Sequence, residues 1–463
     1  MLARARRMLA IAAAKLAYHA ARATGRGGGT AFPGLVAQAL CPGLLAALTG
    51  GLPRGSLVVT GTNGKTTTTR MLSDSLTLAG WSVAHNRHGS NLLRGVTAAA
   101  ALQSTAAGVL PATVGLWETD EAAFPAIVAA VQPRVIVITN LFRDQLDRYG
   151  ETEQIRSRWV SVLPALPRAT LVLNADDPSV ATLGAAHPGP VVYFGISDDS
   201  CRQAGDAHAS DVRTCRRCNG TLTYRQHFLS HLGDWSCPAC GDRRPALTFS
   251  ASAIAPTLRD CSFRLTTPAG TQQIRLPLAG TYNVYNALAA IAAASALALD
   301  AAGAVAALAK FQPAFGRFER LAVAGRELCL FLVKNPTGAN AVLQTLAAAN
   351  ERQLPVLVAI NDLTADGHDV SWLWDADFEL LAGCASPVAT AGIRGADMAV
   401  RLKYAGLPAP AVMPGDDSGE ALYAWLQTIP AGATAYCLAT YTAMLAIQKM
   451  LAARGCKAPY WKE

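Results

Sequence analysis

The sequence predicts an α/β protein with a central domain built on a parallel sheet, a zinc ribbon inserted into that domain, and a smaller C-terminal Rossmann-like domain. Three observations predict this fold. Short apolar runs alternate with helical patterns from about residue 55 to 195. Two Cys-x-x-Cys pairs then interrupt the alternation, between about residues 201 and 250, and a second alternation follows a segment with Pro and Gly near residue 313. We expect a helical lead-in over 1–54, a central domain over 55–312 and a C-terminal domain over 313–463.

The lead-in is predicted to be a basic amphipathic helix. Its sequence, MLARARRMLAIAAAKLAYHAAR, begins like a signal peptide, but Lys15 interrupts the apolar run and no clean cleavage site follows. Such a helix either packs on the next domain or contacts an anionic membrane. The net charge of +8 is compatible with phosphate-rich ligands as well as with an anionic bilayer. We find no run of about 18 uncharged apolar residues with the flanks of a membrane span.

The composition favours a globular enzyme in a reducing compartment. Hydrophobic residues make up 51% of the chain and charged residues 16%, which argues against disorder. The chain has 11 cysteines and no evident secretory signal, which indicates a reducing, cytoplasmic environment. Seven of the cysteines show no pairing logic and are expected to be mostly small buried hydrophobes: Cys41, Cys201, Cys261, Cys329, Cys384, Cys437 and Cys456.

The central domain opens on LVVTGTNGKTTTT, residues 57–69, where an apolar strand runs through a glycine-rich turn into a helix. Backbone N–H groups around Gly61 and Gly64 can cradle phosphates, Lys65 can neutralise a β- or γ-phosphate, and the Thr66 hydroxyl can bind Mg²⁺. The spacing G-x-x-G-K-T is shorter than the general P-loop pattern. The alternative is a Thr-rich loop that only caps a helix.

The remaining elements follow in order along the chain. Strands are expected within 133–140 and 169–174, each ending in Asn at the edge where a parallel sheet binds ligands. Sheet segments continue to about residue 280, and an Ala-rich helix follows over 284–299. In the C-terminal domain we expect strands in ELCLFLV, PVLVAIND, SPVATAG and AYCLAT, with a helix over 338–350, a helix between the second and third strands, and a final helix.

The four organised cysteines match a zinc ribbon. Cys215 and Cys218 form one Cys-x-x-Cys pair and Cys237 and Cys240 form the other, with 18 residues between the pairs. Four thiolates leave no open coordination position, so the expected zinc is structural; redox pairs or chance spacing are the alternatives. His227 and His231 are expected to be surface or core residues and not ligands. The intervening stretch lacks the basic and aromatic pattern of a nucleic-acid-binding ribbon.

Six segments in order resemble the Mur ligase superfamily, the ATP-dependent amide-forming enzymes of peptidoglycan and folate metabolism. They are GTNGKTTT (61–68), ETDE (118–121), TNLFRDQLDRYG (139–150), LNADDP (173–178), GTYNVYNALAA (280–290) and FGRFE (315–319). The resemblance covers about residues 60–460 and implies a Mur ligase-like central ATPase domain. The ATP-binding residues that it implies are Thr62, Asn63, Gly64, Lys65, Thr66, Thr67, Asn283, Asn286 and Arg317, the last across the domain cleft.

The resemblance also implies a magnesium site made by Thr66 and Glu118. Hard cations prefer such oxygen ligands, and an arginine supplied by domain closure can stabilise a transferring phosphoryl group. The alternatives are a solvated acidic cluster for Glu118, with Asp120 and Glu121, and a surface hinge residue for Arg317.

The chain departs from the broader superfamily in three places. Tyr282 replaces a histidine before Asn283, and Gln145 stands where a histidine often follows the aspartate. Residues 151–163 contain Arg156 and Arg158 but no lysine that could be carbamylated. The sequence therefore leaves open whether the usual second-metal arrangement is present.

Three features resemble the amidating branch of the superfamily: the cysteine insertion after LNADDP, the segment ADGHDVSWLWDADFE (365–379), and Lys334 where other Mur ligases have an aspartate. That branch amidates the α-carboxyl of D-glutamate in the lipid II stem peptide to D-isoglutamine, at the inner face of the cell membrane. An acyl phosphate activates the acid, and a GatD-like glutaminase subunit supplies ammonia. By this resemblance Asp369 completes a Cys-His pair on the partner; the alternative is that Asp366 and Asp369 only cap turns and helices.

A separate glutaminase also follows from the residues, since the unassigned cysteines lack the tight G-x-C-x-G setting of a nucleophile elbow. Exposed Trp372 and Trp374 suit an interface, although core packing suits them equally. Two other functions stay open: an autonomous ligase that adds an amino acid, as folylpolyglutamate synthetase does, and a zinc-ribbon ATPase that binds nucleic acid.

Overall fold

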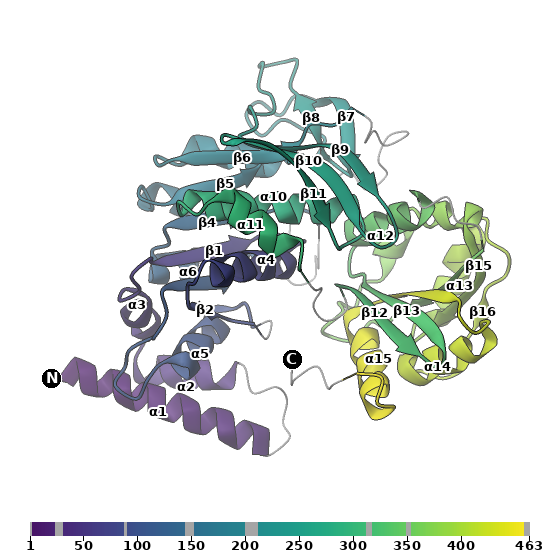
Figure 1. The fold of residues 1–463 in the computed structure, drawn as a ribbon, viewed down its shortest axis with the longest axis horizontal. Helices are drawn as coiled ribbons and strands as arrows, with labels where there is room; N and C mark the ends of the chain where they lie inside the picture. Colours follow the sequence, from purple (N-terminus) through teal and green to yellow (C-terminus); the bar gives the residue numbers. More distant parts are fainter. Residues whose placement is uncertain are drawn as a thin grey trace.

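The computed structural model describes residues 2–23, 31–87, 90–143, 152–199, 212–311, 317–348 and 353–457, except the side chains of Leu2 and Arg317. Gln145, Cys201 and the predicted hinge at 312–316 lie outside these residues. Two α/β lobes stand side by side, and a layer of N-terminal helices lies below the larger one in the view of Figure 1. The predicted α/β class is confirmed.

The N-terminal layer consists of α1 (Leu2–Ala23), α2 (Phe32–Leu40) and α3 (Leu44–Thr49). Helix α1 buries Ala10, Ile11 and Ala14 against the central lobe, in a cluster shared with Val96 of α5 (Leu93–Gln103). Lys15 donates to the Ser104 carbonyl oxygen at 2.6 Å. The lead-in therefore packs on the next domain. Within the described residues, no helix is both long and apolar enough to cross a bilayer.

The larger lobe contains nine strands in the order β11-β10-β9-β6-β5-β4-β1-β3-β2. Strands β1 to β6 and β9 pair in parallel. Strands β10 and β11 add an antiparallel meander at one edge of the sheet. The strands are β1 (Ser56–Thr60), β2 (Val83–His85), β3 (Val114–Glu118), β4 (Val135–Ile138), β5 (Thr170–Asn174), β6 (Val191–Ile196), β9 (Phe249–Pro256), β10 (Cys261–Thr267) and β11 (Gly270–Leu276).

Helices cover both faces of this sheet, so β1 is buried at every position. Leu57 and Val59 face one cluster, with α4 (Lys65–Leu78), α10 (Thr281–Ala296) and α11 (Ala301–Leu308). Val58 faces the other cluster, with α5 and α6 (Phe124–Val131). The remaining elements of this lobe are α8 (Thr152–Val162), η1 (Leu163–Ala165), α9 (Pro178–Ala181) and η2 (Thr182–Ala186).

The cysteine insertion forms an antiparallel hairpin of β7 (Thr223–Leu229) and β8 (Leu232–Ser236), flanked by the two Cys-x-x-Cys turns. It lies above the larger sheet in Figure 1. Buried Trp235 anchors it, because its indole N–H donates to the Ala175 carbonyl oxygen at 2.9 Å, directly after β5.

The smaller lobe has six strands in the order β12-β13-β17-β14-β15-β16. They are β12 (Arg317–Val323), β13 (Arg326–Leu332), β14 (Leu354–Ala359), β15 (Ala385–Ala391), β16 (Ala411–Val412) and β17 (Thr434–Ala439); all neighbours are parallel except β12 and β13. The helices are α12 (Pro336–Ala348), α13 (Gly395–Tyr404), α14 (Ser418–Thr428) and α15 (Tyr441–Ala453).

One predicted helix of this lobe is wrong. Between β14 and β15 the chain forms two short 3₁₀ helices, η3 (Ser371–Trp374) and η4 (Phe378–Gly383). Gly367 has a φ of +86°, and Asp369 accepts the backbone N–H of Ser371 at 2.8 Å. Such left-handed and aspartate-bound turns compete with a continuous helix.

Candidate active site

The glycine-rich loop between β1 and α4 has the backbone that a phosphate cradle requires. Gly61 has a φ of +127°, and a Cβ there would lie 2.3 Å from the Thr139 hydroxyl oxygen. Gly64 has a φ of +85°, and a Cβ there would lie 2.0 Å from Oδ1 of Asn286. Only glycine satisfies both the torsion and the space at these two positions.

The end of β4 holds this loop in place. The backbone N–H of Thr62 donates to the Asn140 carbonyl oxygen at 3.0 Å, and that of Asn63 donates to Oδ1 of Asn140 at 2.8 Å. The Thr62 hydroxyl accepts the Phe142 N–H at 3.0 Å. The polar residues that follow β4 therefore support the loop. Sequence reasoning placed Asn140 at this edge of the sheet but did not predict that it would support the loop.

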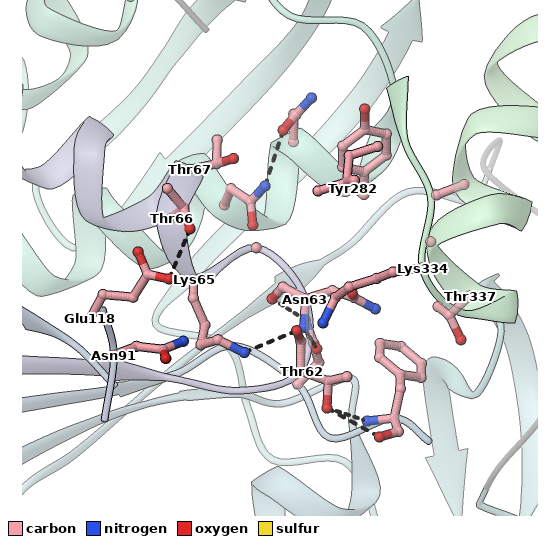
Figure 2. A pocket seen from close by; sticks show the side chains of 18 of the residues that line it. Thr62, Asn63, Lys65, Thr66, Thr67, Asn91, Glu118, Tyr282, Lys334 and Thr337 are labelled. Atoms are coloured by element: carbon pink, nitrogen blue, oxygen red, sulfur yellow. Dashed lines mark hydrogen bonds between the residues drawn. The ribbon is translucent and has the colours of Figure 1, made fainter. Parts of the chain in front are cut away.

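Lys65 and Thr66 are the first residues of α4. Glu118, the last residue of β3, faces Thr66 (Figure 2), and Glu121 faces Lys65. The Lys65 ammonium lies 3.1 Å from Oε1 of Glu121 and also donates to the Gly61 and Thr62 carbonyl oxygens. The Thr66 hydroxyl donates to Oε1 of Glu118 at 2.8 Å. Sequence reasoning did not predict that Glu121 would pair with the P-loop lysine.

Glu118 is buried, which contradicts the alternative of a solvated acidic cluster. Asn86 fixes its backbone by two hydrogen bonds, one from the Glu118 N–H at 2.9 Å and one to its carbonyl oxygen at 2.8 Å. A carboxylate and a hydroxyl oxygen thus converge next to the phosphate cradle. These donors fit Mg²⁺, which prefers one or two carboxylates together with phosphate oxygens and water.

A pocket of about 600 Å³ joins the two lobes at this point. The larger lobe contributes residues 62–67 of the P-loop, together with Glu118, Asn283 and Asn286. Asn286 donates to Oδ1 of Asn283 at 3.0 Å, so the two amides of α10 act together. The full set of predicted residues in the lining is Thr62, Asn63, Gly64, Lys65, Thr66, Thr67, Glu118, Asn283 and Asn286.

The smaller lobe closes the pocket with residues that follow β13. Lys334 and Thr337 face the P-loop from the opposite side (Figure 2). The Asn335 amide donates to Oδ1 of Asn63 at 3.2 Å, which links the two lobes directly. Arg317 begins β12, but its side chain is not among those that the structure describes, so its role in nucleotide binding stays a prediction. Sequence reasoning missed Asn335 and Thr337, although they lie one and three residues after Lys334, which it named.

The four predicted zinc ligands come together at the base of the hairpin. All four Sγ atoms lie within 4.8 Å of one another; Cys215 and Cys240 are 3.6 Å apart, and Cys218 and Cys237 are 3.5 Å apart. Thiolates bound 2.3 Å from a tetrahedral zinc are separated by about 3.8 Å. The cluster therefore fits one zinc ion with no open position.

The hairpin also reaches the pocket, which the sequence did not predict. Leu229 and Leu232 line it, and between them buried His231 packs on Phe142 with ring centroids 4.5 Å apart. His231 is therefore a core residue, as expected; its Nε2 lies 3.4 Å from Oδ2 of Asp177.

A second link runs through Asp176, which is fully buried after β5. Its carboxylate accepts from Arg244 at 3.0 Å, from the Ile196 N–H at 2.8 Å and from the Tyr285 hydroxyl of α10 at 2.8 Å. Burial raises the pKa of Asp176 from 3.8 to about 6, and the neighbouring Arg244 guanidinium opposes this rise. Tyr285 also lines the pocket. Arg244, which follows the ribbon, is therefore connected through Asp176 to the side of α10 that faces the pocket.

Asp369 lies away from the pocket, on an exposed turn before η3. Hydrogen bonds from Ser371 hold the pKa of its carboxyl below the usual range, so it is ionised at neutral pH. Asp366 is buried and accepts from the N–H and hydroxyl of Thr442 at the start of α15. Trp374 is 56% exposed and is therefore not a core residue.

Comparisons with known proteins agree with this architecture. Residues 59–230 and 237–294 match the model of the Mur ligase middle domain, and residues 332–444 match that of the MurT ligase C-terminal domain. A lipid II isoglutaminyl synthase (glutamine-hydrolyzing) subunit MurT of Streptococcus pneumoniae is 32% identical over 92% of this chain and 93% of its own length. The corresponding subunit of Staphylococcus aureus strain COL is 31% identical over 89% and 91%.

Among solved structures, a pseudomurein peptide ligase type C from Methanothermus fervidus superposes with a TM-score of 0.66 at 24% identity, over 86% of this chain and 79% of its own. This likeness shows the fold. Fold and site together define a ligase of the Mur type, a class that uses ATP and Mg²⁺. Within that class the chain belongs to the MurT family.

Proposed function

We propose that the chain amidates the α-carboxyl of D-glutamate in the stem peptide of lipid II, giving D-isoglutamine, with ATP as the activating substrate. The named relatives are subunits of lipid II isoglutaminyl synthase, which supports this acceptor. The observation that carries the proposal is the pocket between the lobes. It places a lysine and a hydroxyl–carboxylate pair of one lobe opposite Lys334 of the other.

The pocket supports activation of an acid through an acyl phosphate. The carboxylate attacks the γ-phosphorus of ATP, the bond from that phosphorus to the β,γ-bridging oxygen breaks, and ADP leaves. Ammonia then attacks the acyl carbon, and inorganic phosphate leaves with the oxygen of the former acid. Lys65 and Lys334 are suited to stabilise the transferring charge, Thr66 and Glu118 to hold Mg²⁺, and Asn283 and Asn286 to position the nucleotide. Arg317 is proposed to reach the nucleotide from the smaller lobe.

A separate GatD-like glutaminase is proposed as the source of ammonia. Among the described cysteines outside the ribbon, Cys261, Cys329, Cys384 and Cys437 are buried. Burial raises the pKa of Cys329 to about 12 and also raises those of Cys384 and Cys437, which makes these thiols poor nucleophiles at neutral pH. Asp369, ionised and exposed, is suited to orient a histidine of that partner.

The test is reconstitution with a glutaminase of this type, ATP, glutamine and lipid II, with the product identified by mass spectrometry. Asp369→Asn is expected to lower the glutamine-driven rate by roughly 10²–10⁴-fold while free ammonium still supports amidation. Asp375→Asn, at a similarly exposed carboxylate six residues along the chain, is the control and should retain the rate.

Two outcomes would contradict the proposal. Normal glutamine hydrolysis by the Asp369→Asn complex would exclude the shared catalytic group. Product formation with an amino acid and ATP, without a glutaminase, would identify an autonomous amino-acid ligase instead.

A further inference from the structure

Helix α1 carries apolar side chains on two opposite sides, one buried and one exposed. One side packs on the central lobe through Ala10, Ile11 and Ala14. On the other side, Leu9 is 59% exposed and Leu16 is 72% exposed. These leucines are seven residues apart, so they project in nearly the same direction, roughly 160° around the helix from Ile11 in the case of Leu9. A soluble surface helix normally has a charged face in that position.

The charge of α1 has one sign. The helix contains Arg4, Arg6, Arg7, Lys15 and Arg22 and no acidic residue. Arg6 is directed to the Leu40 carbonyl oxygen of α2, and Lys15 to the Ser104 carbonyl oxygen of the lobe, so they fasten α1 to α2 and to the lobe. Arg4 and Arg22 are exposed and project in the same direction, because they are 18 residues, or five turns, apart. By the same geometry they project about 120–140° around the helix from Leu9 and Leu16, so these exposed arginines lie near the two ends of the helix and not on its leucine face.

The neighbouring elements also carry exposed apolar side chains. Phe32 and Leu35 of α2 are 56% and 48% exposed, and Val109, in the loop beside Met8, is 57% exposed. Helix α2 packs closely on α5, since a Cβ at Gly34 would lie 1.7 Å from the Arg94 carbonyl oxygen. Ala31 and Arg94 both line the pocket. The N-terminal layer therefore lies at one end of the active-site pocket.

We propose that α1 and α2 form an interfacial module that binds anionic bilayers, with Leu9 and Leu16 entering the headgroup region and the long side chains of Arg4 and Arg22, at the two ends of α1, reaching round the helix to anionic headgroups. Two exposed leucines and a few arginines give a modest, reversible, salt-sensitive attachment. The combination of an apolar face with cations of one sign matches a lipid surface better than a protein surface, whose charges are mixed. The inference does not depend on the proposed reaction; only its consequence, a pocket end held near a lipid-linked acceptor, rests on that function.

The experiment is flotation of the full chain with vesicles, without nucleotide or glutaminase. We expect binding to vesicles of phosphatidylglycerol and phosphatidylcholine at about 1:1, little binding to phosphatidylcholine alone, and at least a tenfold loss of affinity between about 50 and 500 mM salt. Leu9→Gln/Leu16→Gln keeps the net charge and should weaken binding at least tenfold. Arg4→Gln/Arg22→Gln should weaken it and reduce the salt dependence.

The matched control is Leu78→Gln/Val412→Gln, which changes two comparably exposed apolar side chains on α4 and β16. It should bind vesicles like the unmodified chain, and all variants should keep the thermal unfolding midpoint. Unchanged vesicle binding by Leu9→Gln/Leu16→Gln would overturn the proposal, since general positive charge would then explain the attachment. So would an absence of binding together with self-association that these substitutions abolish, because the surface would then be an interface between copies of the chain.

Discussion

Replacing Arg244 with methionine is expected to destabilise the central domain at pH 8 far more than at pH 5. Arg244 is the residue that connects the end of the ribbon to buried Asp176, and its side chain is only 13% exposed. It also donates to the Ile196 carbonyl oxygen at 2.9 Å. Methionine retains much of the volume but leaves the Asp176 carboxylate without its cation.

The expected loss at pH 8 is about 3–5 kcal/mol, the usual cost of leaving one charge of a buried pair uncompensated. At pH 5 the carboxyl of Asp176 binds a proton, since its pKa is raised to about 6. Removing Arg244 then costs only a hydrogen bond to a neutral group, about 1–2 kcal/mol.

The sign of the pH dependence follows from the raised pKa of Asp176. A carboxyl whose pKa is higher in the folded state contributes stability below its unfolded value of 3.8, and this contribution is lost as the pH rises through about 6. The shift of about two units corresponds to roughly 3 kcal/mol. In Arg244→Met the pKa of Asp176 should rise further, so the loss of folding stability continues above pH 6. Asp176→Asn should remove the pH dependence from this window.

The assay is guanidinium unfolding at pH 5 and pH 8 followed by tryptophan fluorescence, because buried Trp235 donates to Ala175 beside Asp176. Arg225→Met is the control, since Arg225 pairs with Asp199 and Asp234 on the same insertion but is 61% exposed. It should cost less than about 1 kcal/mol. Equal losses at the two pH values for Arg244→Met, or a loss below about 1 kcal/mol at pH 8, would refute the reasoning.

Three other predictions concern the metal and nucleotide sites. The purified chain should contain about one equivalent of zinc by elemental analysis, and Cys237→Ser should lose it and make the β7–β8 hairpin sensitive to protease. Gly64→Ala should weaken nucleotide binding roughly 10–100-fold by calorimetry, because the residue has a φ of +85° and its Cβ would collide with Asn286. Thr66→Val should weaken nucleotide binding with Mg²⁺ at least fivefold and without Mg²⁺ much less, since its hydroxyl faces Glu118.

Each of these has a control on the same chain. Cys456→Ser should keep the zinc. Gly80 also has a positive φ, but a Cβ there would meet nothing within 4 Å. Gly80→Ala should therefore lower the free energy of unfolding without a change in nucleotide affinity. Thr77→Val, at an exposed position of α4, should leave Mg²⁺ dependence unchanged. A zinc-free chain with an ordered hairpin, or an affinity loss shared by the control variants, would contradict the corresponding assignment.

Local patterns were sufficient to predict the P-loop, the strand–helix alternation and the cysteine cluster. Each depends on residues close together in the chain, such as Gly64 beside Lys65 or Cys215 beside Cys218. The helix expected between β14 and β15 failed because aspartate-bound turns, as at Asp369, outcompete a continuous helix there.

Contacts between distant segments could not be read in this way. Glu121 pairs with Lys65 from 56 residues away, and Asn335 bonds to Asn63 from 272 residues away. The approach of the ribbon hairpin to the pocket depends on the packing of His231 against Phe142, after β4, and on the hydrogen bond from Trp235 to Ala175, after β5. Sequence periodicity carries no information about which surfaces meet across the fold.

The ion pair between Lys65 and Glu121 has a consequence for selectivity. With exposed fractions of 9% and 6%, both charges are largely withdrawn from solvent, and they neutralise each other. A simple anion such as phosphate gains little from a lysine that is already compensated, because it must also face the carboxylate. A polyphosphate that arrives with its divalent cation brings a counter-charge for the acid together with an anion for the base. The resting pair thus discriminates against stray anions before any catalytic step begins.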